Sequence, residues 1–369
     1  MHTHAHFPRL CWALLLAATG YVLAGGAASA RVAPLSASLA ANAKCRGVPA
    51  VIGGVRRCLK PGQRCNRRLD RQYHKYRFHC HSGRLTRFPK PKPPPPPFEF
   101  AAPTELPLNS AGFDGGPSVS DDGLSLFFIS DRPGGQGGDI WLATRATSSE
   151  PFHSAVNLGP VVNGPGDEGA PSISSDGLSL YFDSDASRQG GQGSGDIWVT
   201  TRLSIAAPFS PPANLGPTVN SSFAEGHPDI SADDLTLYFS SGRPGTCGES
   251  DIWMATRPTR TEPFGRPVNL GSAVNTCAAD EEPSVSRDGL ALFFSSSRSG
   301  GSGMHDLWVT TRSSTSAPFG HPVNLGRTVN SPFDDRTPDI ASDGATLYLM
   351  SNRPGGVGFF DLWESRRTR

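Results

Sequence analysis

From residue 98 to the C-terminus, short runs of alternating apolar and polar residues are separated by turns rich in glycine, proline and aspartate. One such unit reads PSISSDGLSLYFDSD, followed by a glycine-rich loop and then by GDIWVTTR. Apolar residues at every second position predict β-strands with one buried face, and an Asp-Gly pair between two such runs predicts a tight hairpin turn. The pattern therefore predicts three consecutive antiparallel strands in each unit.

The unit occurs five times. A tryptophan marks its third strand at Trp141, Trp198, Trp253, Trp308 and Trp363. Four units continue with a Pro-Phe pair, an Asn-Leu-Gly and a Val-Asn, which predict a fourth strand, whereas the fifth unit stops before this part. The matching part stands at the start of the repeat region, between Phe98 and Asn109. We therefore predict an all-β, five-bladed β-propeller of four-stranded antiparallel blades, closed by an N-terminal strand that completes the last blade.

The repeating units resemble the WD-like propeller repeats of the TolB type, which occur in many bacterial envelope and secreted proteins. The resemblance rests on units such as PSISSDGLSLYFDSD and GDIWVTTR and covers about 270 residues. It implies the propeller fold. It does not imply one function, because propellers include both binding proteins and enzymes.

The loop between the second and third strands is rich in glycine, as in SDRPGGQGGD of the first unit. A phosphate-binding loop is followed by a helix and often by a Lys-Ser or Lys-Thr pair, whereas a strand follows here, so we interpret the loop as a turn. Each of the five loops contains an arginine: Arg132, Arg188, Arg243, Arg298 and Arg353.

The linkers between units also repeat, beginning with an asparagine and carrying an acid at the sixth position. The asparagines are Asn109, Asn163, Asn220, Asn275 and Asn330, and the acids are Asp114, Glu168, Glu225, Asp280 and Asp335. We expect linkers and arginine loops on one face of the ring, with the acids around the mouth of the channel. One interpretation is that each carboxylate fastens adjacent blades by binding an arginine or backbone amides. The other is that some carboxylates face the channel and bind a cation, which makes calcium the one cofactor to consider.

A catalytic role would need asymmetry. A glycoside hydrolase uses one carboxyl as an acid and a second as a nucleophile or base, so particular blades should carry unusual residues. The chain looks nearly symmetric, and its propeller histidines are scattered, which favours a non-enzymatic protein. If it is a glycosidase, Glu168, Glu225 and Asp280 are the first acids to test.

The five tryptophans could stack on sugars, but one per blade at a fixed strand position is typical of core. The aspartates two residues before them are interpreted as hydrogen-bonding residues at the strand entry.

The first thirty residues combine a His- and Arg-containing start, an apolar run and the sequence Ala28-Ser29-Ala30, as in a cleaved secretion signal. A single membrane anchor is the alternative. Cleavage would leave no transmembrane segment and place the protein in the bacterial cell envelope or outside the cell, where disulfides form. We predict a disulfide between Cys247 and Cys277, which lie in neighbouring loops of one face.

Residues 31–88 form a basic module with four cysteines, Cys45, Cys58, Cys65 and Cys80, whose three possible pairings stay open. A zinc site using Cys80 with His79 or His81 is the alternative, but six residues separate Cys58 from Cys65 instead of the usual two, so no metal is expected. Residues 89–97 are a proline-rich spacer, and residues 98–369 are the propeller.

The net charge of +1 conceals two opposite parts. Residues 31–92 contain sixteen Lys and Arg and one acid, Asp70. From residue 93 onward the chain contains seventeen Arg and thirty-two acids. The module could bind an anionic cell-wall polymer, dock onto its own propeller, or carry its charge only for solubility. The aromatic residues among these charges could stack on a ligand or form a small core: Tyr73, Tyr76, Phe78 and Phe88.

These observations together predict an exported, monomeric, non-enzymatic propeller that recognises an extracellular protein or glycan. A glycoside hydrolase that uses channel carboxylates is the alternative function.

Overall fold

The computed structural model describes residues 48–52, 54–76, 78–87, 98–185, 188–245 and 248–368, which fall into two compact units, residues 1–92 and 93–369. The predicted signal, the proline-rich spacer, Cys45, Phe88 and Cys247 lie outside the described residues. Among the described residues, no helix has the length and apolar character needed to span a membrane.

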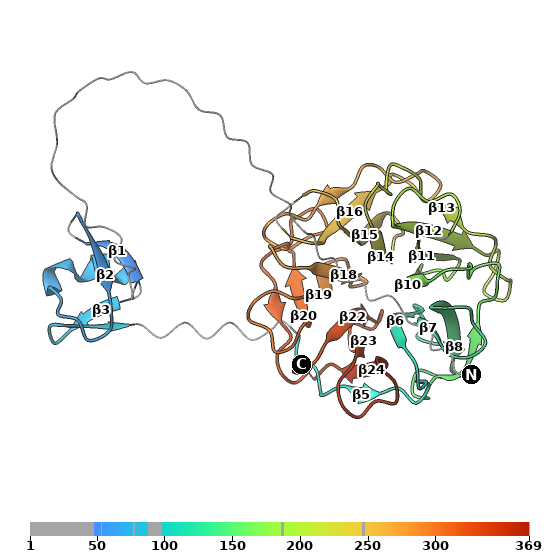
Figure 1. Ribbon diagram of the computed structural model, residues 1–369, viewed down its shortest axis with the longest axis horizontal. Coiled ribbons are helices and arrows are strands. Elements are labelled where there is room, and N and C mark those ends of the chain that lie inside the picture. The colour runs from blue at the N-terminus through green and yellow to red at the C-terminus, as the bar shows by residue number, and fades with distance from the viewer. Residues whose placement is uncertain are drawn as a thin grey trace, which may run out of the picture. The chain divides into compact units, whose positions relative to one another are not determined.

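The larger unit is the predicted five-bladed propeller, with each blade a four-stranded antiparallel sheet (Figure 1). Blade 1 consists of β6 (Asp114–Val119), β7 (Ser125–Ser130), β8 (Asp139–Thr144) and β9 (His153–Asn157). Blade 2 consists of β10 (Glu168–Ile173), β11 (Ser179–Asp185), β12 (Gly195–Thr201) and β13 (Ala213–Asn214). Blade 3 consists of β14 (Glu225–Ile230), β15 (Thr236–Ser241), β16 (Asp251–Thr256) and β17 (Val268–Asn269). Blade 4 consists of β18 (Asp280–Val285), β19 (Ala291–Ser296), β20 (Asp306–Thr311) and β21 (Val323–Asn324).

Blade 5 closes the ring as the sequence predicted. It consists of β22 (Asp335–Ile340), β23 (Thr346–Ser351), β24 (Asp361–Arg366) and, as its outer strand, β5 (Thr104–Glu105) from the start of the propeller. Glu105 is paired with Trp363, which joins the two ends of the repeat region in one sheet. The closure leaves no free blade edge at the seam of the ring.

The hairpin turns and the linkers lie at opposite ends of the inner strands, which defines two faces. In the turn between β6 and β7, Asp122 accepts hydrogen bonds from the Ser120 hydroxyl and the Leu124 amide, and Gly123 has a φ of 71°. This geometry explains the Asp-Gly pair, since glycine adopts a positive φ without strain. We call the end with these turns the turn face, and the end with the linkers and arginine loops the loop face.

Hydrophobic clusters fill the spaces between adjacent blades. One cluster combines Phe128 and Trp141 of blade 1 with Tyr348 and Leu362 of blade 5, and all four side chains are buried. All five tryptophans are between 6% and 9% exposed, so they belong to the core.

A second set of five arginines, not singled out by the sequence pattern, lies near the turn face, and three of them bond a tyrosine hydroxyl of the preceding blade. Arg145 stacks over Phe152 at 4.1 Å and donates a hydrogen bond to the hydroxyl of Tyr348 in the preceding blade. The stacked arginine–phenylalanine pair recurs in the other blades: Arg202–Phe209, Arg257–Phe264, Arg312–Phe319 and Arg367–Phe98. Phe98 therefore performs in blade 5 the role that the Pro-Phe motif performs elsewhere.

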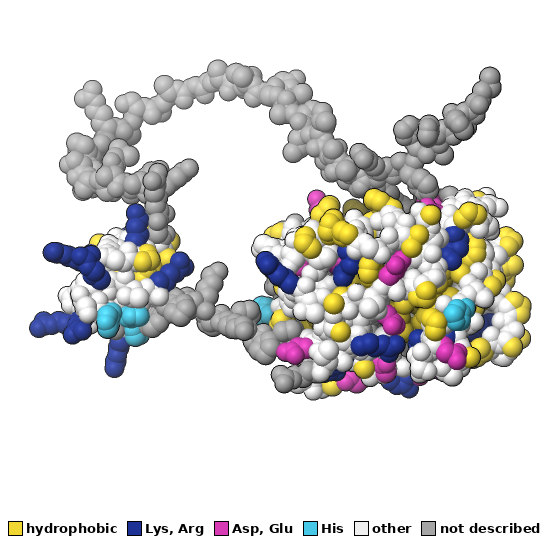
Figure 2. Space-filling view, turned by 90° about the horizontal axis from the view of Figure 1, so that it is seen from below, with side chains coloured by type: hydrophobic (Ala, Val, Ile, Leu, Met, Phe, Trp, Pro, Cys, Tyr) yellow, Lys and Arg dark blue, Asp and Glu magenta, His cyan; other side chains and the backbone are white. Residues whose placement is uncertain are grey.

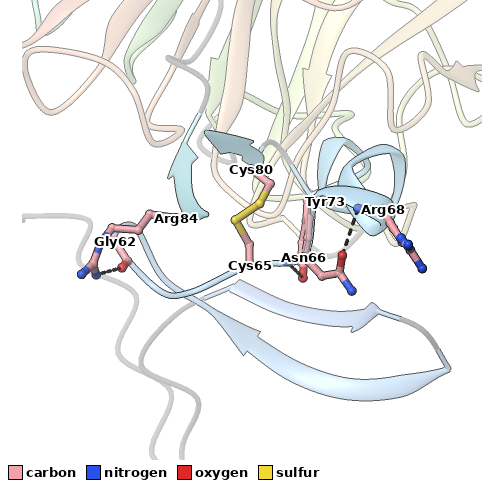
Figure 3. The surroundings of a disulfide bond; sticks show 7 residues. All are labelled: Gly62, Cys65, Asn66, Arg68, Tyr73, Cys80 and Arg84. Atoms are coloured by element: carbon pink, nitrogen blue, oxygen red, sulfur yellow. Dashed lines mark hydrogen bonds between the residues drawn. A yellow bond between two sulfur atoms is a disulfide. The ribbon is translucent and has the colours of Figure 1, made fainter. Parts of the chain in front are cut away.

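The smaller unit contains two hairpins and a short helical segment. The elements are β1 (Val48–Ile52), β2 (Val55–Leu59), η1 (Arg67–Leu69), α1 (Asp70–His74), β3 (Phe78–His81) and β4 (Arg84–Arg87). A disulfide joins Cys65 to Cys80 beside Tyr73 (Figure 3). Cys58 and Cys277 are also disulfide-bonded.

Candidate functional site

The five linker acids and the five loop arginines form ion pairs inside each blade. Arg132 lies 2.5 Å from Asp114, Arg188 lies 2.8 Å from Glu168, and Arg243 lies 3.0 Å from Glu225. The same pair recurs as Arg298–Asp280 and Arg353–Asp335. Every one of these carboxylates is between 0% and 2% exposed. Each arginine thus neutralises a buried carboxylate that would otherwise be costly to desolvate.

Each arginine also fastens the chain segment that enters its blade. Arg132 donates a second hydrogen bond to the carbonyl of Leu108, and its guanidinium lies over the Phe128 and Trp141 rings at 4.9 and 5.4 Å. The arginine therefore joins a blade to the linker that leads into it and does not connect two neighbouring sheets directly.

The expectation that the five acids surround the channel mouth is wrong for their side chains. The channel cavities are lined by other residues, and none of the five acids is among them. The reason is the strand geometry: the acid is the first residue of the inner strand, and its side chain faces the arginine of the same blade. Glu168, Glu225 and Asp280 are thus unsuitable as catalytic acids, and their arginines supply the counter-charge for which a calcium ion was considered.

The side chains of the repeated asparagines form hydrogen bonds with the backbone of the third strand of a blade. Asn163 accepts a hydrogen bond from the Ile140 amide and donates one to the Ile140 carbonyl. Asn109 makes the same two bonds with Leu362, at 2.9 and 3.0 Å, across the seam that closes the ring. The aspartate before each tryptophan is bound in turn, since Asp139 accepts hydrogen bonds from the Gln136 amide and the Asn157 side chain.

The channel is lined by residues that follow the linker acids by two positions. In every inner strand the register shifts at this point, which is a β-bulge. The bulge residues have positive φ angles: Gly116 at 55°, Ala170 at 27°, His227 at 50°, Glu282 at 59° and Thr337 at 44°. Positive φ is strained for every residue except glycine, and such strain concentrates at functional sites.

Two residues further along, a second ring of side chains joins each inner strand to the next. Ser118 accepts a hydrogen bond from the Ile173 amide at 3.1 Å, and Ser172 and Ser284 do the same for Ile230 and Ile340. Aspartates replace serine in two blades. Asp229 accepts from the Val285 amide, and Asp339 accepts from the Val119 amide. Burial raises the pKa of Asp229 well above its usual value and that of Asp339 to about 7.

At the loop-face end of the channel, four polar side chains from four blades come together, three on inner strands and one on a second strand. Glu282 is 3% exposed and lies 2.9 Å from the Nε of Arg336. Its other oxygen accepts hydrogen bonds from the Ser295 hydroxyl and the Thr337 amide. The His227 Nε2 lies 3.6 Å from Glu282, and the His227 amide donates to Asp183 at 2.8 Å. We call Asp183, His227, Glu282 and Arg336 the mouth cluster.

The two carboxyl groups of the mouth cluster have opposite electrostatic environments. Burial raises the pKa of Asp183; the charge of His227 and the hydrogen bond from its amide oppose this effect, and the negative charge of Glu282 adds to it. The pKa of Glu282 lies at about 2 despite its burial, because the charges of Arg336 and His227 and its hydrogen bonds outweigh the desolvation. One group is thus biased towards its protonated form and the other towards its ionised form, which is the arrangement of many acid–base sites.

The mouth cluster does not follow the five-fold repeat, and blade 1 contributes no residue to it. At the second-strand position of Asp183, the other blades carry Ile129, Ser240, Ser295 and Met350. Added Cβ atoms at Gly115 and Gly116 would meet Met350 and Ile129, so the opposite sector is apolar and closely packed. In the sequence this asymmetry is visible only as departures from the repeat at two aligned positions.

The channel is narrow. The cavity at the level of the mouth cluster has a volume of about 30 Å³, and the one below it, towards the turn face, has about 60 Å³. Ser118, Asp229 and Asp339 line both. These volumes hold water molecules rather than a sugar ring. A larger ligand would therefore have to bind above the mouth cluster.

Among the residues that the structure describes, no group of three or more His, Cys, Asp or Glu side chains is arranged to hold a metal ion. The alternative zinc site at Cys80 conflicts with the structure, because Cys80 is bonded to Cys65.

Comparison with known proteins gives similarity of fold only. No protein-family model matches the chain, and no curated protein sequence matches it. The catalytic domain of a GH62 α-L-arabinofuranosidase from Coprinopsis cinerea is 15% identical with a TM-score of 0.50, over 74% of this chain and 98% of that one. An α-L-arabinofuranosidase from Lactobacillus brevis is 13% identical with a TM-score of 0.48, over 69% and 90% of the two chains. TolB from Acinetobacter baumannii is 14% identical with a TM-score of 0.44, over 74% and 64%.

These neighbours correct the functional prediction. The neighbour with a TM-score of 0.50 is the catalytic domain of a glycoside hydrolase, and at 15% identity the likeness is one of fold. The prediction of a non-enzymatic recognition protein rested on the near symmetry of the repeats, and the channel mouth lacks that symmetry. The prediction is therefore wrong, and the enzyme alternative has the better support: the chain has a five-bladed propeller fold in common with glycoside hydrolases.

Proposed function

We propose that this protein is a glycoside hydrolase that acts at the loop-face mouth of its channel, with Asp183 and Glu282 as the carboxyl pair. The observation that carries this proposal is the mouth cluster itself, a group of charged side chains from blades 2 to 5 that has no equivalent in blade 1. Glycoside hydrolysis needs one carboxyl that can give a proton and a second that is ionised near the reacting carbon.

In the scheme that we propose, Asp183 donates its proton to the oxygen of the leaving group. Glu282 acts as the base: it takes a proton, directly or through the His227 ring, from the water molecule whose oxygen bonds to the sugar carbon as the bond to the leaving group breaks. The side chain of His227 is 34% exposed and is thus the more accessible of the two, whereas Glu282 is nearly enclosed. Arg336 keeps Glu282 ionised and acts as a positioning residue.

The size of the channel supports a substrate that binds above the cluster. Water occupies little space and fits into the cavity beneath, so a water molecule could reach the reacting carbon from the channel side. The loop face also exposes aromatic side chains, including Phe333 at 41% and Phe359 at 72%. Aromatic rings of this kind offer apolar faces on which sugar rings can stack. The fold of the Coprinopsis cinerea enzyme makes α-L-arabinofuranosides the first substrates to test.

The test is hydrolysis of aryl glycosides and of plant-type polysaccharides, beginning with an aryl α-L-arabinofuranoside and an arabinoxylan. We expect Asp183→Asn and Glu282→Gln each to lower kcat/KM by about 100-fold or more. Glu150→Gln, which removes an exposed carboxylate outside the channel, serves as the matched control and should leave turnover unchanged. Thermal melting of each variant separates loss of catalysis from loss of folding.

Two results would overturn the proposal. One is the absence of turnover by the wild-type protein across a broad panel of glycosides, and the other is full activity in correctly folded Asp183→Asn. In the pH profile, replacing Asp183 by Asn should remove the limb in which activity falls as pH rises, because that limb reports the acid losing its proton.

We also propose that the enzyme works in the cell envelope or outside the cell. The support is the disulfide between Cys65 and Cys80 and the disulfide-bonded state of Cys58 and Cys277, since such bonds persist in oxidising compartments. N-terminal sequencing of the protein recovered from culture medium or envelope fractions should find Arg31 as the first residue. A mature chain that still carries Met1 would contradict this.

A further inference from the structure

The smaller unit carries a concentrated positive charge that hydrolysis in the propeller does not use. Residues 48–87 contain eleven Lys and Arg and a single acid, Asp70, and ten of these cations are among the residues that the structure describes. The ten are Arg56, Arg57, Lys60, Arg64, Arg67, Arg68, Arg71, Lys75, Arg84 and Arg87, and every one is exposed. Figure 2 shows several of them projecting from different sides of this unit, with no acidic side chain visible on the face in view.

These cations lie close to one another instead of being separated by acids. A β-bridge places Arg64 directly opposite Arg84, and like charges in that position destabilise a sheet. Arg67 and Arg71 are spaced by four residues along the helical segment, where like charges also repel. Asp70, the one carboxylate of the unit, is not among the side chains that the structure describes, and a single carboxylate can neutralise only one of these cations. The repulsion is relieved when a polyanion binds.

The module is a firm scaffold for these charges. Ile52, Leu59, Phe78 and Leu85 form its core together with Tyr73, and all five side chains are buried. The Cys65–Cys80 disulfide joins the segment before α1 to β3 (Figure 3). The guanidinium of Arg84 is itself held by a 2.8 Å hydrogen bond to the Gly62 carbonyl. Charges fixed in this way need less ordering when they bind a ligand.

Among the described residues of the module, no tyrosine or phenylalanine ring is fully exposed for stacking, and Tyr76 is half-buried. Tyr73 and Phe78 are buried, the Tyr73 hydroxyl accepts a hydrogen bond from the Asn66 amide, and the Tyr76 hydroxyl accepts one from the Val51 amide. Proteins that bind single-stranded nucleic acid usually stack bases on exposed aromatic rings. Recognition by this surface is therefore a matter of charge, and it suits a polymer without bases.

We propose that the basic module binds an anionic polysaccharide, a glycan chain with repeated carboxylate or phosphate groups. Eight of the ten cations are arginines, whose planar guanidinium groups match both kinds of anion by paired hydrogen bonds. Binding would hold the protein on an anionic glycan surface. The inference does not depend on the hydrolase activity of the propeller.

The experiment measures binding of the full-length protein to fluorescent polygalacturonate and to fluorescent poly(glycerol phosphate), by anisotropy at several salt concentrations. The first polymer tests carboxylate and the second tests phosphate. Neutral dextran, single-stranded DNA and double-stranded DNA of similar length are the comparison ligands. We expect affinity for at least one anionic glycan to fall steeply with salt, because bound cations displace counter-ions.

The variant pair is Arg67→Gln with Arg71→Gln, since both side chains are exposed and lie outside the core of the module. The matched control is Arg266→Gln with Arg327→Gln, two exposed arginines of the propeller. The module variant should bind about tenfold more weakly at 0.1 M salt, with the logarithmic salt slope reduced by about two, while the control keeps wild-type binding.

Equal loss in the control, or no loss in the module variant, would overturn the inference. So would tighter binding of either DNA than of both glycans, which would identify a nucleic-acid module. Docking of the module onto its own acidic propeller would appear as absent glycan binding at every salt concentration. Glu282→Gln should bind the polymer normally, so failure of the hydrolase proposal remains distinguishable from failure of this one.

Discussion

Replacing Arg298 by Met should destabilise the propeller strongly, because it leaves Asp280 buried without its counter-charge. Asp280 is 0% exposed and is bound by Arg298 and by the Ser296 hydroxyl. Removing one partner of a buried ion pair costs about 3–5 kcal/mol. The variant also loses the hydrogen bond to the Val274 carbonyl, although the apolar part of Met can still cover the adjacent rings.

The assay is thermal unfolding of the full-length protein, followed by circular dichroism and calorimetry. A loss of about 3–5 kcal/mol corresponds to a decrease in Tm of about 6–20 °C for a domain of roughly this size. Adding Asp280→Asn to the variant removes the unpaired charge and should restore part of the loss. Arg327→Met, at an exposed position without an ion pair, is the control and should change Tm by less than about 1 °C. A decrease as small as that in Arg298→Met would refute the reasoning.

Three further predictions concern the channel, the seam and the module. Asp339→Ser, which installs the residue of three other blades, should flatten the pH dependence of stability. The pKa of Asp339 is raised to about 7, so the native protein holds a proton that the unfolded chain has lost, and the stability of the wild type should fall as pH rises from about 4 to 7. Melting at pH 5 and pH 8 checks this, and the same difference in Tm between the two pH values in variant and wild type would contradict it. Asn109→Leu should cost about 2–3 kcal/mol by leaving buried backbone groups at Leu362 unpaired. Asn275→Leu should cost as much in denaturant unfolding, but only Asn109→Leu should increase proteolysis at the seam of the ring. Cys65→Ala with Cys80→Ala should lower the stability of the module by about 3 kcal/mol, measured by hydrogen exchange, and unaltered protection there would refute it.

The sequence alone was sufficient to predict the architecture. Five copies of one unit, each with alternating apolar residues, an Asp-Gly turn and a tryptophan, define the strands and their order. The incomplete fifth unit and the extra segment from Phe98 to Asn109 predict the closure that the β5–β24 pairing confirms. Local patterns carry this information because a repeated unit that buries one face must stack on copies of itself.

The sequence could not indicate which acids face the channel. Glu168, Glu225 and Asp280 stand out because they recur, and recurrence proved to reflect an internal ion pair with an arginine. Asp183 and Glu282 depart from the repeat and were therefore overlooked.

Tertiary structure decides that Asp183 and Glu282 lie together at the mouth of the channel. A β-bulge shifts the register of every inner strand, and in a strand a shift of one residue turns a side chain from one face to the other. The pairing that sets this register, and the neighbouring blade that brings His227 beside Asp183, exist only when the ring is assembled. The chain thus determined its propeller through local patterns, while the assembled ring decided which of its many acids share one site.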